Sequence, residues 1–176
     1  EKIIMTSDGI ENMEDFPESM VILGAGVIGC EFATIFSGFG RTKVHLIDKG
    51  DRILPFEDED VVKVIERNME NNGVLIHRNS RLVRMEVKNN RVEYELEYND
   101  GAKEIFNVEK ALVSVGRTPN YEDLWEDGGV EIHISKRGIE DNDTQTNVSN
   151  IYAVGDITAD ISLVNVGELE GRYAVE

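Results

Sequence analysis

The sequence contains little cysteine and little positive charge, and it has no long hydrophobic run. Cys30 is the single cysteine among 176 residues, which excludes an internal disulfide framework and a zinc site made of cysteines. Lys and Arg number 18 against 35 Asp and Glu, a net charge of −17, whereas nucleic acids and anionic membranes require clustered basic side chains. We therefore expect neither as a partner. No apolar run approaches the roughly 20 residues of a membrane span, and no segment has a signal-peptide pattern, so we expect a cytoplasmic location.

The remaining composition is that of a globular domain. Hydrophobic residues make up 40% of the chain and charged residues 30%, values that are typical of folded proteins and not of disordered ones. The length fits one domain, or one domain with an appendage. Because the sequence starts at Glu1 in the middle of a pattern, we expect it to be a piece of a longer protein.

The first half of the chain alternates short buried strands with helices. Apolar runs of strand length occupy 20–23, 44–47 and 74–77. A first helix follows residue 29 and ends near Gly40, and its expected buried face is Ile28, Phe32, Ile35, Phe36 and Phe39. A second helix opens between residues 55 and 60 and ends near Gly73, with an apolar stripe of Val61, Val62, Ile65 and Met69. The order βαβαβ predicts an α/β fold with a parallel, doubly wound sheet.

The pattern changes after residue 80. Residues 92–98 alternate strictly between apolar and acidic, as expected for a strand with one solvated face, and Asn99-Asp100-Gly101 predicts a hairpin turn to a strand at 103–108. Residues 110–115 form another buried strand. We expect a polar loop at 121–147 with short strand signals at 130–134, a last strand at 151–154, a helix at 164–176, and a linker at 1–18.

A glycine loop is the main functional signal. Gly24-Ala25-Gly26-Val27-Ile28-Gly29 follows a strand and opens a helix, which is the context that a dinucleotide-binding GxGxxG requires. Gly24 allows the turn, Gly26 lets a pyrophosphate approach the backbone, and Gly29 lets the helix pack on the strand. The helix N-terminus then attracts the phosphates. The alternative interpretation is a tight strand–helix turn without a ligand.

Asp48 ends the second strand, 24 residues after Gly24, close to the acidic position of the fingerprint. A carboxylate there accepts hydrogen bonds from an adenosine ribose and repels a 2′-phosphate, which favours NAD over NADP. A solvated strand-end aspartate beside Lys49 is the alternative. Arg52 instead favours NADP, because a nearby arginine can accommodate a 2′-phosphate.

The other polar candidates have structural explanations. Glu31, in the first turn of the helix, is stabilised by the helix dipole. Cys30 lacks a second cysteine for a redox pair and is interpreted as a packing residue. The histidines at 45, 77 and 133 have no metal-ligand spacing, so no metal site is predicted. The acidic positions 93, 95 and 97 are interpreted as a solvated strand face.

Four motifs in this order resemble one family. They are GAGVIGCE at 24–31, the strand-ending Asp48, VSVGRTPN at 113–120 and NIYAVGD at 150–156. Together they resemble the flavin-dependent pyridine nucleotide–disulfide oxidoreductases, in particular the dihydrolipoamide dehydrogenases and the soluble pyridine nucleotide transhydrogenases. The resemblance implies a Rossmann-like three-layer NAD-binding domain made of a parallel sheet, helices and an antiparallel meander. Parts of a split FAD domain would lie at both ends.

The resemblance also implies domains and site residues. Residues 1–18 would be the edge of the FAD domain, 19–147 the NAD-binding domain, and 148–176 part of the C-terminal half of the FAD domain. The NAD-binding residues would be Gly24, Ala25, Gly26, Val27, Ile28, Gly29, Glu31, Asp48, Leu82 near the adenine, and Gly116 at the nicotinamide end. Glu31 would lie near nicotinamide and flavin as a catalytic candidate. The FAD-binding residues would be Asp156, Ser162, Leu163, Val164 and Asn165.

The implied function is hydride transfer between NAD(H) and FAD in a longer, homodimeric enzyme. Within the family, Asn165 stands where dihydrolipoamide dehydrogenases usually have a histidine, so the subfamily stays open. A transhydrogenase needs the same two nucleotide sites, and mercuric or glutathione-type reductases are further options. An NAD-sensing module without flavin is the alternative outside enzymes. The chain alone is expected to bind NAD without turnover, because the first FAD motif, the CxxxxC disulfide and the dimer domain are absent from it.

Overall fold

The computed structural model describes residues 2–121, 124, 129–136, 138–158 and 161–176. The chain divides into two compact units, residues 1–116 and 117–176. This division follows the packing of the chain and falls after the end of the parallel sheet. The boundary at residue 147 inferred from the sequence instead separates the expected NAD-binding residues from the expected FAD-binding domain, and it stays a proposal.

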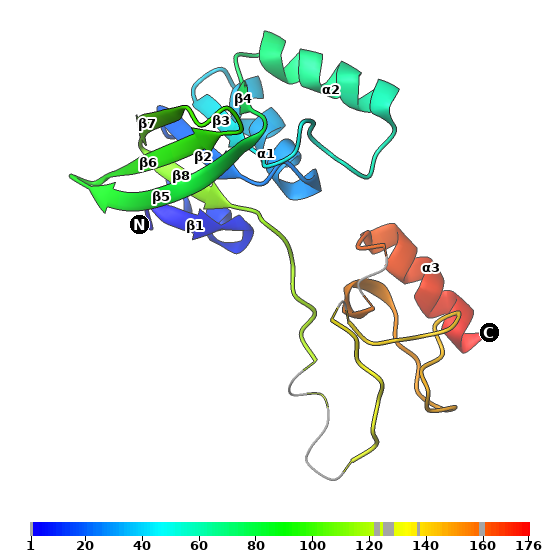
Figure 1. Cartoon of the computed structure of the whole chain (residues 1–176). Coiled ribbons are helices and arrows are strands. Elements are labelled where there is room, and N and C mark those ends of the chain that lie inside the picture. Colours follow the sequence, from blue (N-terminus) through cyan, green and yellow to red (C-terminus); the bar gives the residue numbers. More distant parts are fainter. Residues whose placement is uncertain (1, 122–123, 125–128, 137, 159–160) are drawn as a thin grey trace. The chain divides into compact units, whose positions relative to one another are not determined.

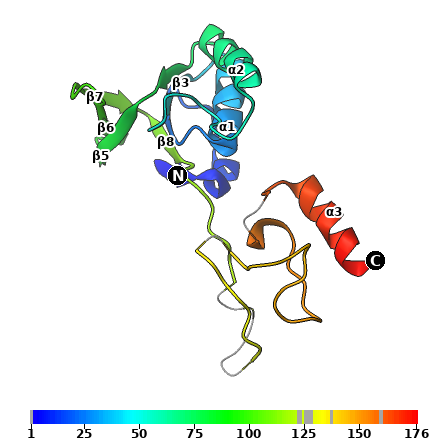
Figure 2. The ribbon, with the colours of Figure 1, turned by 45° about the vertical axis from the view of Figure 1, so that its right-hand side comes forward.

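A five-stranded parallel sheet forms the centre of the first unit. Its order is β1-β8-β2-β3-β4, with β1 at Ile4–Thr6, β2 at Ser19–Leu23, β3 at Lys43–Ile47, β4 at Leu75–His77 and β8 at Lys110–Val113. Helices α1 (Val27–Gly38) and α2 (Glu59–Asn71) connect β2 to β3 and β3 to β4. Figure 2 shows both helices on one side of this sheet. The predicted βαβαβ order is confirmed.

A three-stranded antiparallel sheet covers the other face. It consists of β5 (Ser80–Lys88), β6 (Arg91–Tyr98) and β7 (Lys103–Val108), paired in that order. Figure 1 shows β5, β6 and β7 side by side across the unit. The predicted hairpin turn is present, and Gly101 has φ +83°, a conformation that glycine adopts without steric cost. The three layers confirm the predicted α/β, Rossmann-like class.

Two cores explain why the parallel strands read as continuous apolar runs. On β2, Met20 and Ile22 pack with α1 and α2, whereas Val21 and Leu23 pack with the antiparallel sheet. The same alternation along β3 places Leu46 in the first core and Ile47 in the second. A strand that is buried on both faces needs apolar side chains at both phases of its pleat.

The buried face of α1 differs from the prediction. Phe36 is buried, but Ile35 and Phe39 are 48% and 63% exposed. The buried surface instead contains the small residues Cys30 and Ala33, together with Gly29 and Ser37. Small side chains let the helix lie close to the strands, which is the packing function of the third glycine in such loops.

The segment 1–18 also differs from the predicted linker. Residues 4–6 pair as β1 with β8, and a 3₁₀ helix follows at Ser7–Asn12; Glu1 lies outside the described residues. Met5 is buried in the first core. A three-residue apolar run is too short to indicate a strand by itself, and it becomes one because β8 presents a free edge.

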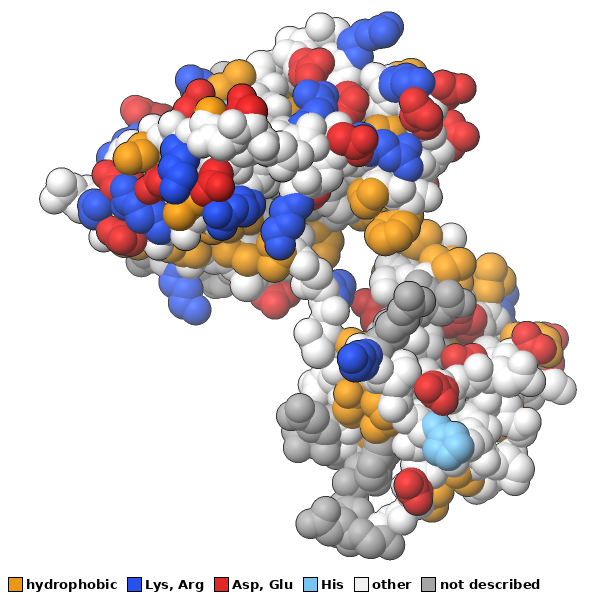
Figure 3. Space-filling model, in the orientation of Figure 1, with side chains coloured by type: hydrophobic (Ala, Val, Ile, Leu, Met, Phe, Trp, Pro, Cys, Tyr) orange, Lys and Arg blue, Asp and Glu red, His pale blue; other side chains and the backbone are white. Residues whose placement is uncertain are grey.

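The acidic stripe of β6 is paired and not simply solvated. Glu93 accepts from Arg84 at 2.7 Å and Lys88 at 2.8 Å, and Glu95 accepts from Arg84 at 3.0 Å. Their side chains are only 25% and 18% exposed. Figure 3 shows acidic and basic side chains interleaved over this part of the surface. The predicted solvent-facing stripe therefore also carries ion pairs, whose basic partners come from neighbouring strands.

The second unit contains a 3₁₀ helix, η2 (Gly155–Ile157), and helix α3 (Val164–Val175). The predicted helix at 164–176 is confirmed. The predicted strands at 130–134 and 151–154 are not formed; only single bridges join Ile134 to Ile139 and Tyr152 to Gln145. Of the predicted loop 121–147, residues 122–123, 125–128 and 137 lie outside the described residues. Over the part of the chain that the structure describes, no helix is both long and apolar enough to cross a membrane.

Candidate dinucleotide-binding site

Two positions of the glycine loop admit no side chain. Gly24 has φ +95°, and a Cβ there would lie 2.5 Å from the carbonyl oxygen of Ser114. A Cβ on Gly29 would lie 1.9 Å from the carbonyl oxygen of Gly24. Both distances are far below van der Waals contact, so the loop closes against β8 and against its own helix only because these residues are glycine.

The middle glycine lies in different surroundings. A Cβ on Gly26 would meet nothing within 4 Å, and the residue is exposed at the N-cap of α1. No side chain of the described residues caps this helix, and its first internal hydrogen bond runs from Cys30 N to Gly26 O. The amide groups of Val27, Ile28 and Gly29 therefore have no acceptor within the helix and lie at the positive end of the helix dipole. This cradle fits a pyrophosphate.

Asp48 is tied to the glycine loop. Its Oδ2 accepts from the backbone N–H of Ala25 at 2.8 Å, and its Oδ1 accepts from Gly50 N–H at 2.8 Å. Leu54 N–H in turn donates to Ala25 O at 2.8 Å. Both backbone groups of Ala25 are thus satisfied, and the buried residue fixes the loop to the end of β3. The half-buried carboxylate keeps further lone pairs for another donor.

Ser114 is a site residue that the sequence reasoning missed. Its hydroxyl donates to Leu23 O at 2.8 Å and to Gly24 O at 3.2 Å, and its N–H donates to Leu23 O at 2.9 Å. It thereby joins the end of β8 to the start of the loop. Gly116, two residues further on, has φ +135° with open space around it. The VSVGR motif could have indicated Ser114 as a site residue, because this serine directly follows a buried strand.

The other NAD candidates of the first unit lie in distinct surroundings. Glu31 is exposed on α1, but it does not lie in the first turn as predicted, because the helix already begins at Val27. Leu82 is partly buried on β5 and packs on the core between the sheets. Cys30 is buried, and burial, reinforced by the carboxylates of Asp48 and Glu66, raises the pKa of its thiol to about 12. A thiol that stays protonated is no nucleophile, in agreement with its interpretation as a packing residue.

The FAD candidates lie in the second unit. Asp156 pairs with Arg117, whose Nε lies 3.2 Å from Oδ2, and both side chains are more than half exposed. The residues 162–165 are exposed around the start of α3. Gly155 N–H donates to Glu170 Oε2 at 2.7 Å, which joins η2 to α3. Asp156 thus presents a carboxylate that can bind hydroxyl groups, as the ribityl chain of a flavin would require.

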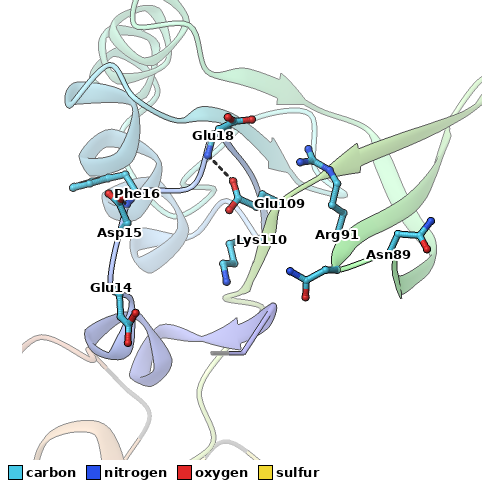
Figure 4. A pocket seen from close by; sticks show the side chains of 9 residues that line it. Glu14, Asp15, Phe16, Glu18, Asn89, Arg91, Glu109 and Lys110 are labelled. Atoms are coloured by element: carbon cyan, nitrogen blue, oxygen red, sulfur yellow. Dashed lines mark hydrogen bonds between the residues drawn. The ribbon is translucent and has the colours of Figure 1, made fainter.

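Two hollows lie on the surface of the first unit. One of about 510 Å³ is lined by Glu14, Glu18, Glu109 and Arg91 among others. Figure 4 shows Glu109 directed at the backbone of Glu18 in this hollow. It lies where β2 and β8 begin, opposite the glycine loop at their ends. The second, of about 470 Å³, is lined by Lys49 and by residues of β5 and β6, and lies beside Asp48.

Metal binding receives no support from the described residues. Within residues 2–121 and the described parts that follow, no three His, Cys, Asp or Glu side chains are grouped as a metal site.

The layers and the glycine loop together define a Rossmann-like α/β class. Comparison with known proteins then places the chain in a particular family. A family model described as pyridine nucleotide-disulphide oxidoreductase matches residues 2–171, and the chain belongs to this family. The resemblance stated from the motifs is thereby confirmed.

The relatives are oxidoreductases. The chain is 37% identical to a dihydrolipoyl dehydrogenase of Acholeplasma laidlawii, covering 99% of this chain and 49% of the relative. It is 38% identical to a soluble pyridine nucleotide transhydrogenase of Pseudomonas aeruginosa, covering 97% and 36%. The chain therefore spans half or less of the length of the curated relatives it matches.

The chain is also similar to solved structures of flavoprotein reductases. The flavoprotein disulfide reductase RclA of Escherichia coli superposes with a TM-score of 0.82 at 28% identity, covering 97% of this chain and 37% of that one. LpdA of Mycobacterium tuberculosis superposes with a TM-score of 0.81 at 26% identity, covering 97% and 36%.

Proposed function

We propose that the first unit binds NAD(H) and that the whole protein transfers hydride between NAD(H) and FAD, most closely in the manner of a dihydrolipoamide dehydrogenase. The observation that carries the proposal is the glycine loop. Gly24 and Gly29 are enclosed by backbone, whereas Gly26 opens on free space at an uncapped helix N-terminus. A turn needed only for the fold would not require a glycine at the open position.

The backbone would hold the pyrophosphate. The amides of Val27, Ile28 and Gly29 have no internal helical partner and would donate to phosphate oxygens. With a net charge of −17, most of the protein surface repels a dinucleotide. The local dipole of α1 supplies the attraction that the side chains do not.

Asp48 would hold the adenosine ribose and select NAD over NADP. Its carboxylate is already fixed by Ala25 and Gly50, so it is preorganised and cannot turn away from a 2′-phosphate. Arg52, which could favour NADP, directs its guanidinium to the carbonyl of Pro55. Leu82 and Gly116 would contact the adenine and nicotinamide ends.

The flavin would be bound by the whole protein. A bound FAD supplies an acceptor for the nicotinamide hydride and passes electrons onward. Within this chain Asp156 and the exposed residues 162–165 would contribute to that site, and Glu31 would lie near the reacting rings. The family to which the chain belongs supports this assignment. We expect the whole protein to form a homodimer.

A binding experiment tests the nucleotide site. Isothermal titration of the chain with NADH is compared with the Gly26→Ala variant. The added methyl group occupies the open space without touching the protein, so thermal stability should stay within about 0.5 kcal/mol of wild type, while NADH affinity falls at least about tenfold. Equal NADH affinity in the two proteins would refute the assignment.

A second titration tests the choice of nucleotide. NADH should bind more tightly than NADPH, and Asp48→Asn should remove much of the difference. Asparagine retains one acceptor for the backbone of the loop and removes the negative charge. A preference that survives in Asp48→Asn would assign nucleotide selection to other residues.

Transhydrogenase activity is the alternative within the family, because the chain is as similar to those relatives as to the dehydrogenases. The two activities are separated with the whole protein by measuring NADH-linked reduction of lipoamide against hydride exchange between NADPH and NAD⁺. Lipoamide reduction supports the first proposal, and exchange without it supports the second.

A further inference from the structure

A hydrogen-bonded row of side chains lies between the two sheets of the first unit. Nε2 of His77 lies 3.2 Å from Nδ1 of His45, and their rings stack. Tyr94 Oη lies 2.9 Å from the same Nδ1 of His45. At the other end, Tyr98 Oη lies 2.8 Å from Nδ1 of His77 and donates to Glu104 at 3.3 Å. The sequence showed three histidines far apart, and the fold brings two of them together.

Neutral imidazoles satisfy the row with a consistent set of proton positions. When Tyr98 donates to Glu104, Nδ1 of His77 carries a proton and donates to Tyr98. The bare Nε2 of neutral His77 then accepts from Nδ1–H of His45. One additional proton could sit on Nε2 of His77 and be directed at a bare Nδ1 of His45. Two additional protons would place N–H against N–H at 3.2 Å, which is repulsive.

The surroundings oppose even the first additional proton. His45 is 5% exposed, and burial, then His77, then Lys43 on its own strand lower its pKa to about 4. Burial also lowers the pKa of His77, against the opposing effect of Glu104 on β7. From β6 the pair faces the hydroxyls of Tyr94 and Tyr98, and burial raises the pKa of both phenols. From β7 the uncharged ring of Phe106 completes the enclosure.

We propose that His45 and His77 form an acid-sensitive junction between the two sheets. A proton taken up below neutral pH charges the pair and loosens the antiparallel sheet from β3 and β4. The imidazoles come from the parallel sheet and the phenols from the antiparallel sheet, so a charge in the row acts on the interface itself and not on either sheet alone.

The direction of the effect follows from proton linkage. Both histidines bind protons more weakly in the folded chain than in the unfolded chain, whose imidazoles titrate near 6.5. The contribution of His45 is therefore complete above pH 6.5 and is lost as the pH falls toward its folded value of about 4. The contribution of His77 changes in the same direction, because burial lowers its pKa as well. At pH 5 the displacement of His45 alone corresponds to a change on the order of thirtyfold in the unfolding equilibrium constant relative to pH 7.5.

The junction also reaches the proposed nucleotide site, a step that rests on the proposed function. The N–H of Asp48 donates to the carbonyl of His77 at 3.0 Å, and the carboxylate of Asp48 holds Ala25 of the glycine loop. A shift of β3 and β4 against the antiparallel sheet would move the end of β3 and with it Asp48. We therefore expect acid to weaken dinucleotide binding as well as stability.

The experiment combines proton NMR of the imidazoles with urea unfolding at pH 7.5 and 5. Three proteins are compared: wild type, the double variant His45→Asn with His77→Gln, and His133→Asn. Asparagine places an amide where Nδ1 of His45 lies, and glutamine places one where Nε2 of His77 lies. His133 is exposed in the second unit, so its variant removes a histidine without touching the junction.

Between pH 7.5 and pH 5 the unfolding equilibrium constant should rise in all three proteins. The rise in wild type and in His133→Asn should be at least tenfold larger than the rise in the double variant. Two imidazoles of wild type should titrate below 6.5, that of His45 near 4. Two imidazoles titrating near 6.5, or an equal pH dependence in all three proteins, would overturn the proposal. The NMR titration needs no substitution, so it decides the matter even where the double variant fails to fold.

Binding of NAD⁺, which survives acid better than NADH, provides the second readout. Its affinity should fall with pH more steeply in wild type than in the double variant. Absence of NAD⁺ binding at pH 7.5 would count against the proposed function, while the NMR titration would still test the junction. An equally steep fall in both proteins would refute the link from the junction to the nucleotide site.

Discussion

The two units of the chain obtain their structure in different ways. The first contains two hydrophobic cores on either side of a parallel sheet. In the described part of the second, Ile139 and Ala153 are the buried hydrophobic residues, accompanied by the buried polar residues Thr144 and Thr146. Helix α3 has no buried residue, and its Leu169 and Tyr173 are more than 60% exposed.

The difference shows which unit can be stable by itself. Burial of apolar surface stabilises a fold by about 25 cal/mol per Å², and this term operates on both faces of the sheet in the first unit. The second unit depends on hydrogen bonds within turns, such as those from Thr146 Oγ1 to Val148 O and Ile151 O. Such bonds each contribute only about 1 kcal/mol net. We expect the first unit to unfold as one cooperative body and the second to open more easily.

Of the substitutions that test the difference between the two units, Gly29→Ala in the first unit is expected to cause the largest loss of stability. The new Cβ would overlap the carbonyl of Gly24, so the helix must leave the sheet or the loop must open, at a cost of about 3 kcal/mol or more. Urea unfolding followed by circular dichroism measures the loss. Gly38→Ala in the same helix is the control, because a Cβ there meets nothing within 4 Å. A Gly29→Ala protein as stable as this control would contradict the geometry of the loop.

A smaller and local effect is expected from Gly138→Ala in the second unit. Gly138 has φ +157°, and a Cβ would lie 2.4 Å from the carbonyl of Ile157. The substitution should cost about 1–3 kcal/mol within that unit and leave the first unit unchanged. Hydrogen exchange measured by mass spectrometry should show lost protection at 138–158 and normal protection in β2 and β3. Lost protection in both regions would show that the units do not fold independently.

The smallest effect is expected from Arg84→Gln on the antiparallel sheet. Arg84 bonds Glu93 and Glu95, but screening by water and salt limits the value of exposed pairs. The urea midpoint should fall slightly at low salt and less at 1 M salt. Arg41→Gln, whose partner Asp15 lies 4.0 Å away, should change it even less. A loss that is independent of salt would mean that Arg84 acts through packing and not through charge.

The sequence predicted those elements whose signal is local. The apolar runs of the central strands, the glycine loop and the Asn-Asp-Gly turn were each recognised correctly. The prediction failed where strand formation depends on a neighbouring strand. Residues 4–6 form a strand because they pair with β8, whereas the more apolar segment 151–154 forms only a single bridge. A strand requires a neighbour to satisfy its backbone groups, and a short segment carries no information about that neighbour.

The candidate site shows the same division. Gly24, Gly26, Gly29 and Asp48 were identified from their spacing, but the hydrogen bond from Ala25 to Asp48 and the contacts of Ser114 were not. The face of α1 was predicted from hydrophobicity, and the close approach to the sheet selected small residues instead. The acidic stripe was read from β6 alone, although its basic partners lie on β5 and β7.

By itself, the sequence determined the glycine loop, because the conformations open to a residue without a Cβ are a property of that residue. It also determined the acidic charge, which leaves the backbone as the surface to which we propose that a dinucleotide binds. Only the tertiary structure decided that His45 and His77 meet, that Asp48 is anchored to the loop, and that the single cysteine is buried. These features join residues 23 to 49 positions apart along the chain or depend on packing from several elements, and such contacts arise only when the layers close on one another.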